Sequence, residues 1–330
     1  MNVIAFPTQI APARDRADGP FPGGKRFAFT IVDDTDHGNV ANLAPVYELL
    51  ERHGILTTKT VWVYPPRGTF TGECLEDAHY LAFIRQLQAA GFEIALHNVG
   101  DGYFSRDEIK AGLDRFRELL GHHPRMHINH SKNTDNLYWS WQRFSFPIRP
   151  VAHLIARLSS IGRDVWRGTR GSYERSPQFW GDLAKERIKY FRNLTFDEID
   201  TYRIDPRMPY RVSDKDQFSN LWFSSSNGSN LPEMLRLLSP QNLDRLEKSG
   251  GVCIVYTHFG VGFVDGQGRV DARFRERIED LASREGYFVP ASDLLEFLSA
   301  RNGTVDDPGI FYRLRLESKW LAEKLKQKFW

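Results

Sequence analysis

The segment FTIVDDTDHGN, residues 29–39, joins a short apolar run to a dense group of ionisable side chains. Its first four residues are apolar or β-branched and predict a buried strand. Asp33, Asp34, Asp36 and His37 follow within five positions. Like charges at this density cost free energy unless a cation, hydrogen bonds or shared protons relieve them. A solvated turn is the alternative, because Asp, Asn and Gly are ordinary turn residues.

The composition of the 330-residue chain is that of an ordinary globular protein. Its formal net charge of +2 indicates no bulk electrostatic partner, so we expect no nucleic-acid binding. Cys74 and Cys253 lie far apart, which excludes a disulfide framework and a cysteine zinc motif. The sequence has neither the apolar run of a signal peptide nor a stretch that could span a bilayer. We therefore expect a cytoplasmic protein without a transmembrane segment.

Strand-like and helix-like segments alternate along the chain. Strands are expected at residues 26–32, 55–65, 92–97, 125–130, 220–226, 252–260 and 287–290. Helices are expected at residues 42–54, 75–91, 105–121, 239–251, 271–286 and 291–303. Repeated βα units with short apolar strands predict a parallel sheet covered by helices. We expect a distorted parallel (β/α) barrel of about seven strands, with an open doubly wound sheet as the alternative.

The expected domain organisation has one main domain and two flanking segments. They are a loosely ordered arm at 1–25, the barrel domain at 26–304 and a C-terminal basic amphipathic helix at 305–330. Residues 134–215 predict an irregular insertion, helical at 150–161 and 177–192. The last segment carries six basic and two acidic residues from Arg313 onward. Such a helix binds an anionic membrane surface or docks on its own domain or a second subunit, so a homo-oligomer is an open alternative.

Ionisable side chains stand at the ends of four expected strands. Asp33 and Asp34 follow the first strand, and His97, His130 and His258 end three others. Because ligands bind at the carboxyl ends of parallel strands, these residues are expected to meet at one rim. Two imidazoles and a carboxylate make a divalent-metal site, for which zinc is the first expectation. Cobalt, manganese, nickel and iron suit the same donors.

Four segments together resemble the motifs of the polysaccharide deacetylases, the NodB-homology superfamily. They are TIVDDTD (30–36), GFEIALHNVGD (91–101), GHHPRMHINHS (121–131) and GGVCIVYTHFG (250–260). The resemblance implies a barrel of about seven strands and metal-dependent N- or O-deacetylation of a carbohydrate. It also implies that Asp33 is the general base, that Asp34 binds the metal with two histidines, and that His258 is the general acid.

The chain departs from the family pattern at two positions. The second metal-binding histidine of the family falls at Asp101, so either Asp101 or His130 completes a site with Asp34 and His97. The family's third-motif arginine, which orients the base, has no counterpart at its position, and Arg125 or Lys132 are the candidates to replace it. The chain is then a divergent enzyme or a degenerate protein that only binds carbohydrate.

Polar and aromatic residues of the expected upper loops are candidates for substrate binding. Stacking on a sugar ring and hydrogen bonding to its hydroxyls are the roles expected for Asn129, Trp180, Asp182, Trp222, Ser225 and Asn227. The alternative is that the tryptophans belong to the core and that the Ser/Asn cluster forms a turn. We expect a bacterial enzyme that deacetylates a lipid-linked or nucleotide-linked sugar in surface polysaccharide or glycan biosynthesis. A metal-dependent hydrolase of another C–N bond is the remaining alternative.

Overall fold

The structure is a computed structural model that describes residues 19–158, 169–303 and 306–329. Its central strand is β1 (Phe27–Asp33), in which every residue is buried. The strand β7 (Val252–Thr257) pairs with one edge of β1 along six residues. The other edge is divided, because β8 (Gly286–Phe288) pairs with its first three residues and β2 (Thr58–Val61) with its last two.

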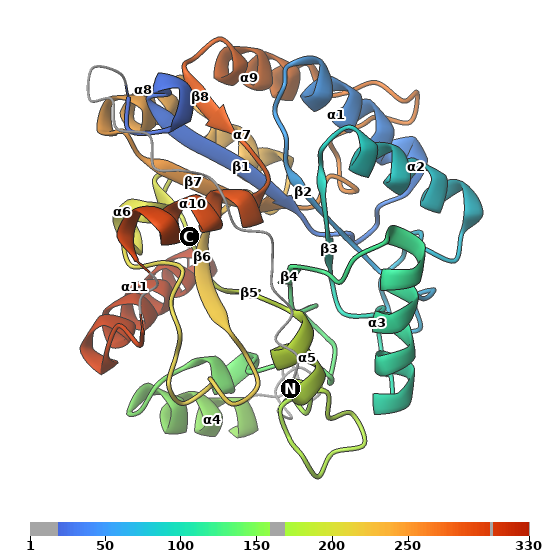
Figure 1. Cartoon of the computed structure of the whole chain (residues 1–330). Coiled ribbons are helices and arrows are strands. Elements are labelled where there is room, and N and C mark those ends of the chain that lie inside the picture. The colour runs from blue at the N-terminus through green and yellow to red at the C-terminus, as the bar shows by residue number, and fades with distance from the viewer. Residues whose placement is uncertain (1–18, 159–168, 304–305, 330) are drawn as a thin grey trace.

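The strands close into a barrel (Figure 1). The order is β2, β3 (Glu93–Leu96), β4 (Met126–His127), β5 (Tyr190–Phe196), β6 (Leu221–Asn227), β7 and β1, and β1 returns to β2. All of these pairs are parallel, and β8 is an extra strand outside the ring. The expected distorted barrel of seven strands is confirmed. All strand carboxyl ends therefore point to one rim.

The helices between the strands cover the outside of the barrel (Figure 1). They are α1 (Val40–Arg52), α2 (Ala78–Ala89), α3 (Arg106–Leu120), α7 (Leu231–Leu237), α8 (Pro240–Ser249), α9 (Ala272–Ala282) and α10 (Ala291–Asn302). The expected capping box of α3 is present: Ser105 caps the backbone of Glu108, and Glu108 caps that of Ser105. Ile109, Leu113 and Phe116 give α3 its buried face.

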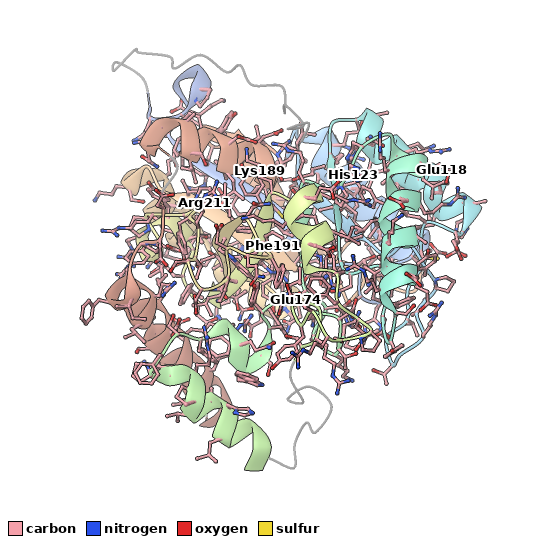
Figure 2. The ribbon with its side chains drawn as sticks, turned by 60° about the horizontal axis from the view of Figure 1, so that its bottom comes forward. Glu118, His123, Glu174, Lys189, Phe191 and Arg211 are labelled. Atoms are coloured by element: carbon pink, nitrogen blue, oxygen red, sulfur yellow. The ribbon has the colours of Figure 1, made fainter. Side chains whose placement is uncertain are left out.

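The expected insertion at 134–215 contains a barrel strand as well as helices. It holds the 3₁₀ helix η2 (Ser140–Arg143), α4 (Ile148–Leu158), α5 (Gly181–Arg187), β5 and α6 (Thr201–Ile204). The expected helix at 177–192 is wrong in its second half, because the chain is extended from Ile188 and enters β5. The polar pair at 192–193 hides the strand pattern in the sequence. Figure 2 shows α5 beside α3, which it contacts through ion pairs of Arg106 with Asp182 and Arg187 with Asp114.

Both flanking segments pack on the barrel where the structure describes them. Most of the expected arm, residues 1–18, lies outside the described residues, but Phe21 beside the short 3₁₀ helix η1 (Pro22–Gly24) contacts the rings of Tyr287 and Phe297. The C-terminal helix α11 (Ile310–Phe329) buries Leu316 and contacts β5. No helix in the described parts of the chain has the length and apolar content needed to cross a membrane.

Candidate metal centre

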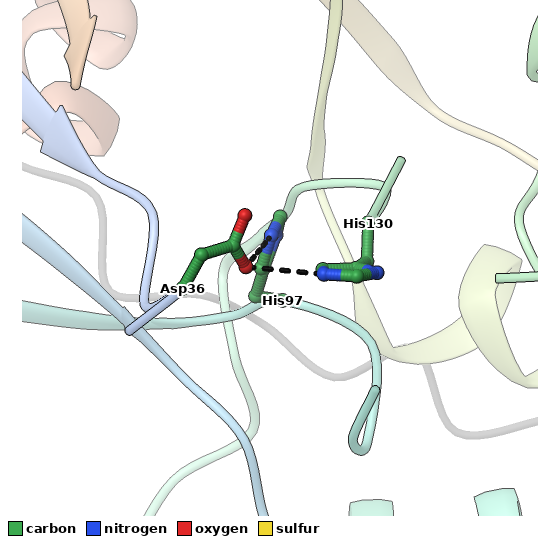
Figure 3. A group of neighbouring side chains, drawn as sticks. All are labelled: Asp36, His97 and His130. Atoms are coloured by element: carbon green, nitrogen blue, oxygen red, sulfur yellow. Dashed lines mark ion pairs between the residues drawn. The ribbon is translucent and has the colours of Figure 1, made fainter. Parts of the chain in front are cut away.

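Three buried side chains from three different loops meet at the carboxyl rim (Figure 3). Asp36 follows β1, His97 follows β3 and His130 follows β4. The Asp36 Oδ1 atom lies 3.3 Å from His97 Nε2 and 3.1 Å from His130 Nε2. The candidate ligand atoms all lie within 4.8 Å of one another. The three residues are spread over almost a hundred positions of the sequence. They converge because the parallel strands that they follow end at the same rim.

The polar atoms of this group fit a divalent cation. Asp36 Oδ1 and His130 Nε2 are buried and lie within ion-pair distance of each other, but neither makes a hydrogen bond of good geometry with a described residue. Burying polar atoms without good hydrogen bonds costs free energy, which a bound cation would recover. Burial alone would raise the pKa of Asp36. The charge of His97 and the contacts with His130 and His258 instead hold that pKa well below its usual value, so the group is a carboxylate.

Groups behind the two histidines fix their rings. His97 Nδ1 lies 3.1 Å from the carbonyl oxygen of Ile128, which can only accept, so Nδ1 carries the proton and Nε2 is free to coordinate. His130 Nδ1 lies 3.7 Å from Asp101 Oδ1. Of the two alternatives for the third ligand, the structure therefore brings His130 into the group and leaves Asp101 behind it. Such outer carboxylates orient metal-binding imidazoles.

Asp34 is held by a buried arginine and is not part of the three-residue group. Arg192 of β5 donates to both carboxylate oxygens of Asp34, over 2.9 Å and 2.5 Å. Burial raises the pKa of Asp34, but the Arg192 charge and hydrogen bond outweigh it and lower that pKa. Arg125 and Lys132 do not replace the family arginine, because Arg125 pairs with Asp293 and Lys132 Nζ lies 3.0 Å from the hydroxyl oxygen of Thr69.

Asp33, which is expected to be the general base, lies in a buried environment behind the three-residue group. The side chain is fully buried, with Oδ2 2.9 Å from Lys59 Nζ and 3.0 Å from the Tyr47 hydroxyl. Its Oδ1 accepts a hydrogen bond from the backbone N–H of Phe259. The carboxylate therefore neutralises a buried lysine and has no exposed face for a water or substrate.

His258 faces the same group from β7. Its Nδ1 lies 2.7 Å from the Ser229 carbonyl oxygen, and its Nε2 lies 3.3 Å from Asp36 Oδ2. Burial lowers the pKa of His258, but the contact with Asp36 and the charges of Asp34 and Asp36 raise it to about 9. Its side chain is 21% exposed, against 8% or less for Asp36, His97 and His130. His258 is thus the member of the rim that is most exposed to solvent among these four side chains.

Neither the protein-family models nor the curated proteins match this sequence. Solved structures do match. A probable polysaccharide deacetylase from Pseudomonas aeruginosa PAO1 has a TM-score of 0.52 and 12% identity, over 86% of this chain and 94% of that one. The chain has the polysaccharide deacetylase fold. The Puue allantoinase shares the fold, with a TM-score of 0.53 and 13% identity over 89% and 99% of the two chains.

Within this deacetylase fold, the residues expected to bind substrate are mostly structural. Trp180 and Trp222 are each 1% exposed and donate their indole N–H groups to Asp135 and Ser219, so the structure places both in the core, the alternative to stacking on a sugar. Asn129 is buried and hydrogen-bonded to Leu137. Asn227 donates hydrogen bonds to Asp197 and Glu233, and Ser225 is fully buried. Asp182 forms an ion pair with Arg106 between the outer helices α5 and α3.

The residue that sequence reasoning missed most clearly is Arg192. We expect Arg192→Lys to retain metal but to lower kcat by about 10²-fold, because a point charge cannot reproduce the two parallel hydrogen bonds that orient Asp34. Steady-state kinetics beside metal analysis would check this. The matched control is Arg187→Lys, which alters the ion pair with Asp114 between α5 and α3 and should leave kcat unchanged. Unchanged kcat in Arg192→Lys would contradict the positioning role.

A substitution at Asp101 tests whether this carboxylate positions the His130 ring. Its Oδ2 accepts from the backbone N–H of Phe70, and a Cβ at Gly68 would lie 2.5 Å from it, so the 67–73 loop closes tightly over this carboxylate. We expect Asp101→Asn to weaken metal affinity about 10- to 100-fold, because the amide holds the His130 ring less firmly. Competition with a chromophoric chelator would measure the affinity. An affinity equal to that of the parent protein would refute the role.

Proposed function

We propose that this chain is a metal-dependent hydrolase that removes an acetyl group from a saccharide. The observation that carries the proposal is the Asp36–His97–His130 group beside the Asp34–Arg192 pair and His258 at one barrel rim. Each group has a role in hydrolysis of an amide or ester. A purely carbohydrate-binding protein would not need a buried carboxylate and two imidazoles with their ligand atoms within 4.8 Å of one another.

Asp36, His97 and His130 would hold the metal. Zinc suits two imidazoles and a carboxylate best, and cobalt, manganese, nickel and iron suit the same donors. When bound there, a divalent ion would supply a Lewis acid for the acyl carbonyl and lower the pKa of water. We assign the metal-ligand role expected of Asp34 to Asp36 instead, because Asp36 and not Asp34 groups with His97 and His130.

Asp34 is the group that takes a proton from the attacking water. Arg192 fixes its orientation and keeps it ionised. His258 donates a proton to the departing nitrogen or oxygen, since its Nδ1 is committed to Ser229 and its Nε2 points to the centre. The reaction consumes one water and breaks the C–N or C–O bond. It releases acetate and the free amine or hydroxyl.

The substrate we favour is an acetylated sugar on a lipid or nucleotide carrier, used in surface polysaccharide or glycan assembly by a bacterial cell. A cyclic amide is the second candidate, supported by the likeness to the allantoinase fold. An N-acetyl group and a cyclic amide both contain the C–N bond to be broken, and the proposed proton transfers serve either. The two candidates differ in their product, because ring opening releases no acetate.

The first experiment is the metal content of protein purified without chelators or nickel resin. About one divalent ion per chain should be found, and acetate release should then be assayed on N-acetylated and O-acetylated sugars, with allantoin in parallel. Acetate from a sugar would support the deacetylase, and turnover of allantoin alone would favour the cyclic amidase. A folded chain that binds no zinc, cobalt or manganese would refute the hydrolase.

A further inference from the structure

A β-bulge lies next to the arginine that holds Asp34. The register between β5 and β6 shifts between Arg192 and Thr195, so that two residues of β5, Asn193 and Leu194, lie opposite one residue of β6. A bulge bends its strand and redirects neighbouring side chains, and bulges are common beside active sites. Because Arg192 directly precedes the bulge, the shape of the bulge influences where its guanidinium points.

One buried side chain fixes the backbone of this bulge. Arg143, at the end of η2, is 7% exposed and donates to the carbonyl oxygen of Asn193 over 2.9 Å. A buried arginine is usually compensated by a carboxylate, but Arg143 forms no ion pair with any described residue. Burial and the neighbouring charge of Arg192 lower the pKa of Arg143 to about 9, so the side chain remains a cation at neutral pH.

Two tryptophans take the place of a carboxylate partner. The guanidinium carbon of Arg143 lies 3.8 Å from the ring centroid of Trp139 and 5.2 Å from that of Trp320. An indole ring attracts a desolvated guanidinium through its quadrupole. These neutral rings hold Arg143 without placing a second carboxylate near Arg192, which therefore keeps Asp34 as its ion-pair partner.

The turn that presents Trp139 has a strained backbone. Tyr138 and Ser140, on either side of it, have φ values of 49° and 57°, in the left-handed region that residues other than glycine rarely adopt. Such conformations cost free energy and persist only where the surrounding structure imposes them. Strain in the turn that brings Trp139 onto Arg143 favours a functional role for this contact.

The second tryptophan connects the rim to the C-terminal helix. α11 lies against β5 on the outside of the barrel (Figure 1). Glu317, one turn before Trp320, is buried and accepts the backbone N–H of Ser145 with both carboxylate oxygens. The helix is thus attached to the segment that carries Arg143 and packs on the strand that carries Arg192.

We propose that Arg143 is a positioning residue for the proposed reaction. Held by Trp139 and Trp320, it fixes the bulge of β5 and thereby keeps Arg192 on Asp34. The C-terminal helix α11 then contributes to catalysis through Trp320. The effect on hydrolysis rests on the proposed function, whereas the fixing of the bulge does not.

Arg143→Met tests the proposal, because it keeps an apolar stem beside the tryptophans but removes the charge and the hydrogen bond to Asn193. In the full chain, amide hydrogen exchange should become faster in the peptide that covers β5. On an acetylated sugar, kcat should fall by about 10- to 10²-fold, while KM and the metal content stay unchanged. Arg143→Lys, which can still donate to Asn193, should keep part of the activity.

The matched control is Arg207→Met at the start of α11. Arg207 donates to the carbonyl oxygen of Pro308 over 2.8 Å and lies over the ring of Tyr312. Its variant loses the same kinds of contact to the C-terminal segment and should change neither kcat nor exchange in β5. In the double variant Arg143→Met with Arg192→Lys, kcat should equal that of Arg192→Lys alone, because both substitutions act on one pair.

The outcomes distinguish a positioning role from a purely structural one. Unchanged exchange in β5 of Arg143→Met would overturn the proposal. Faster exchange with an unchanged kcat, or losses that simply add in the double variant, would leave Arg143 as a structural contact and overturn its positioning role. If the parent protein hydrolyses no acetylated sugar, the proposed function fails, and the exchange of β5 still decides whether Arg143 fixes the bulge.

Discussion

Asp36→Asn should remove both the metal and the activity. The substitution replaces the carboxylate that contacts His97, His130 and His258 by a neutral amide. Metal content should fall from about one ion per chain to near zero, and kcat/KM by about 10³-fold or more, because a metal supplies several kcal/mol of transition-state stabilisation. Elemental analysis and acetate release on the same preparations would measure both.

Asp34→Asn is the control that separates the two carboxylates. Because Asp34 binds Arg192 rather than the three-residue group, this variant should keep its metal while losing about 10²- to 10⁴-fold in kcat. Loss of the metal from Asp34→Asn and its retention in Asp36→Asn would reverse the assignment. That result would restore the ligand set expected from the family resemblance.

The strand-end rule brought the imidazoles and Asp34 to the rim but did not select Asp36 as the carboxylate beside the imidazoles. His97, His130 and His258 each end or follow a strand, and the barrel brings them to one rim. The expected first strand stopped at residue 32, whereas β1 continues through Asp33. A shift of one residue reverses the face to which a strand side chain points. Asp33 is therefore directed to Lys59, and the carboxylate that reaches the histidines comes three residues later.

Arg192 shows the other limit of sequence reasoning. It pairs with Asp34 across 158 residues, and the resemblance placed the equivalent arginine near residues 121–131. An arginine inside a strand interrupts the apolar pattern that identifies buried strands, so the helix expected at 177–192 runs into the first residues of β5. Burial of the Arg192 charge is compensated by Asp34, the residue that follows β1. Only the closed barrel, which places β5 near the end of β1, reveals it.

Asp33→Asn should act on stability rather than on chemistry. It leaves Lys59 fully buried without its counter-charge, and breaking one partner of a buried pair costs about 3–5 kcal/mol. The free energy of unfolding, measured with urea at neutral pH, should fall by that amount.

The double variant Asp33→Asn with Lys59→Met decides whether the loss comes from the unpaired charge. It should recover much of the stability, because no buried cation remains, and metal should bind with the parent affinity once the chain is folded. If Asp33→Asn instead unfolds at the parent urea concentration but has lost hydrolysis, the buried pair is dispensable and Asp33 is the base that the family resemblance implied. The two readings of this carboxylate predict opposite results in two independent measurements.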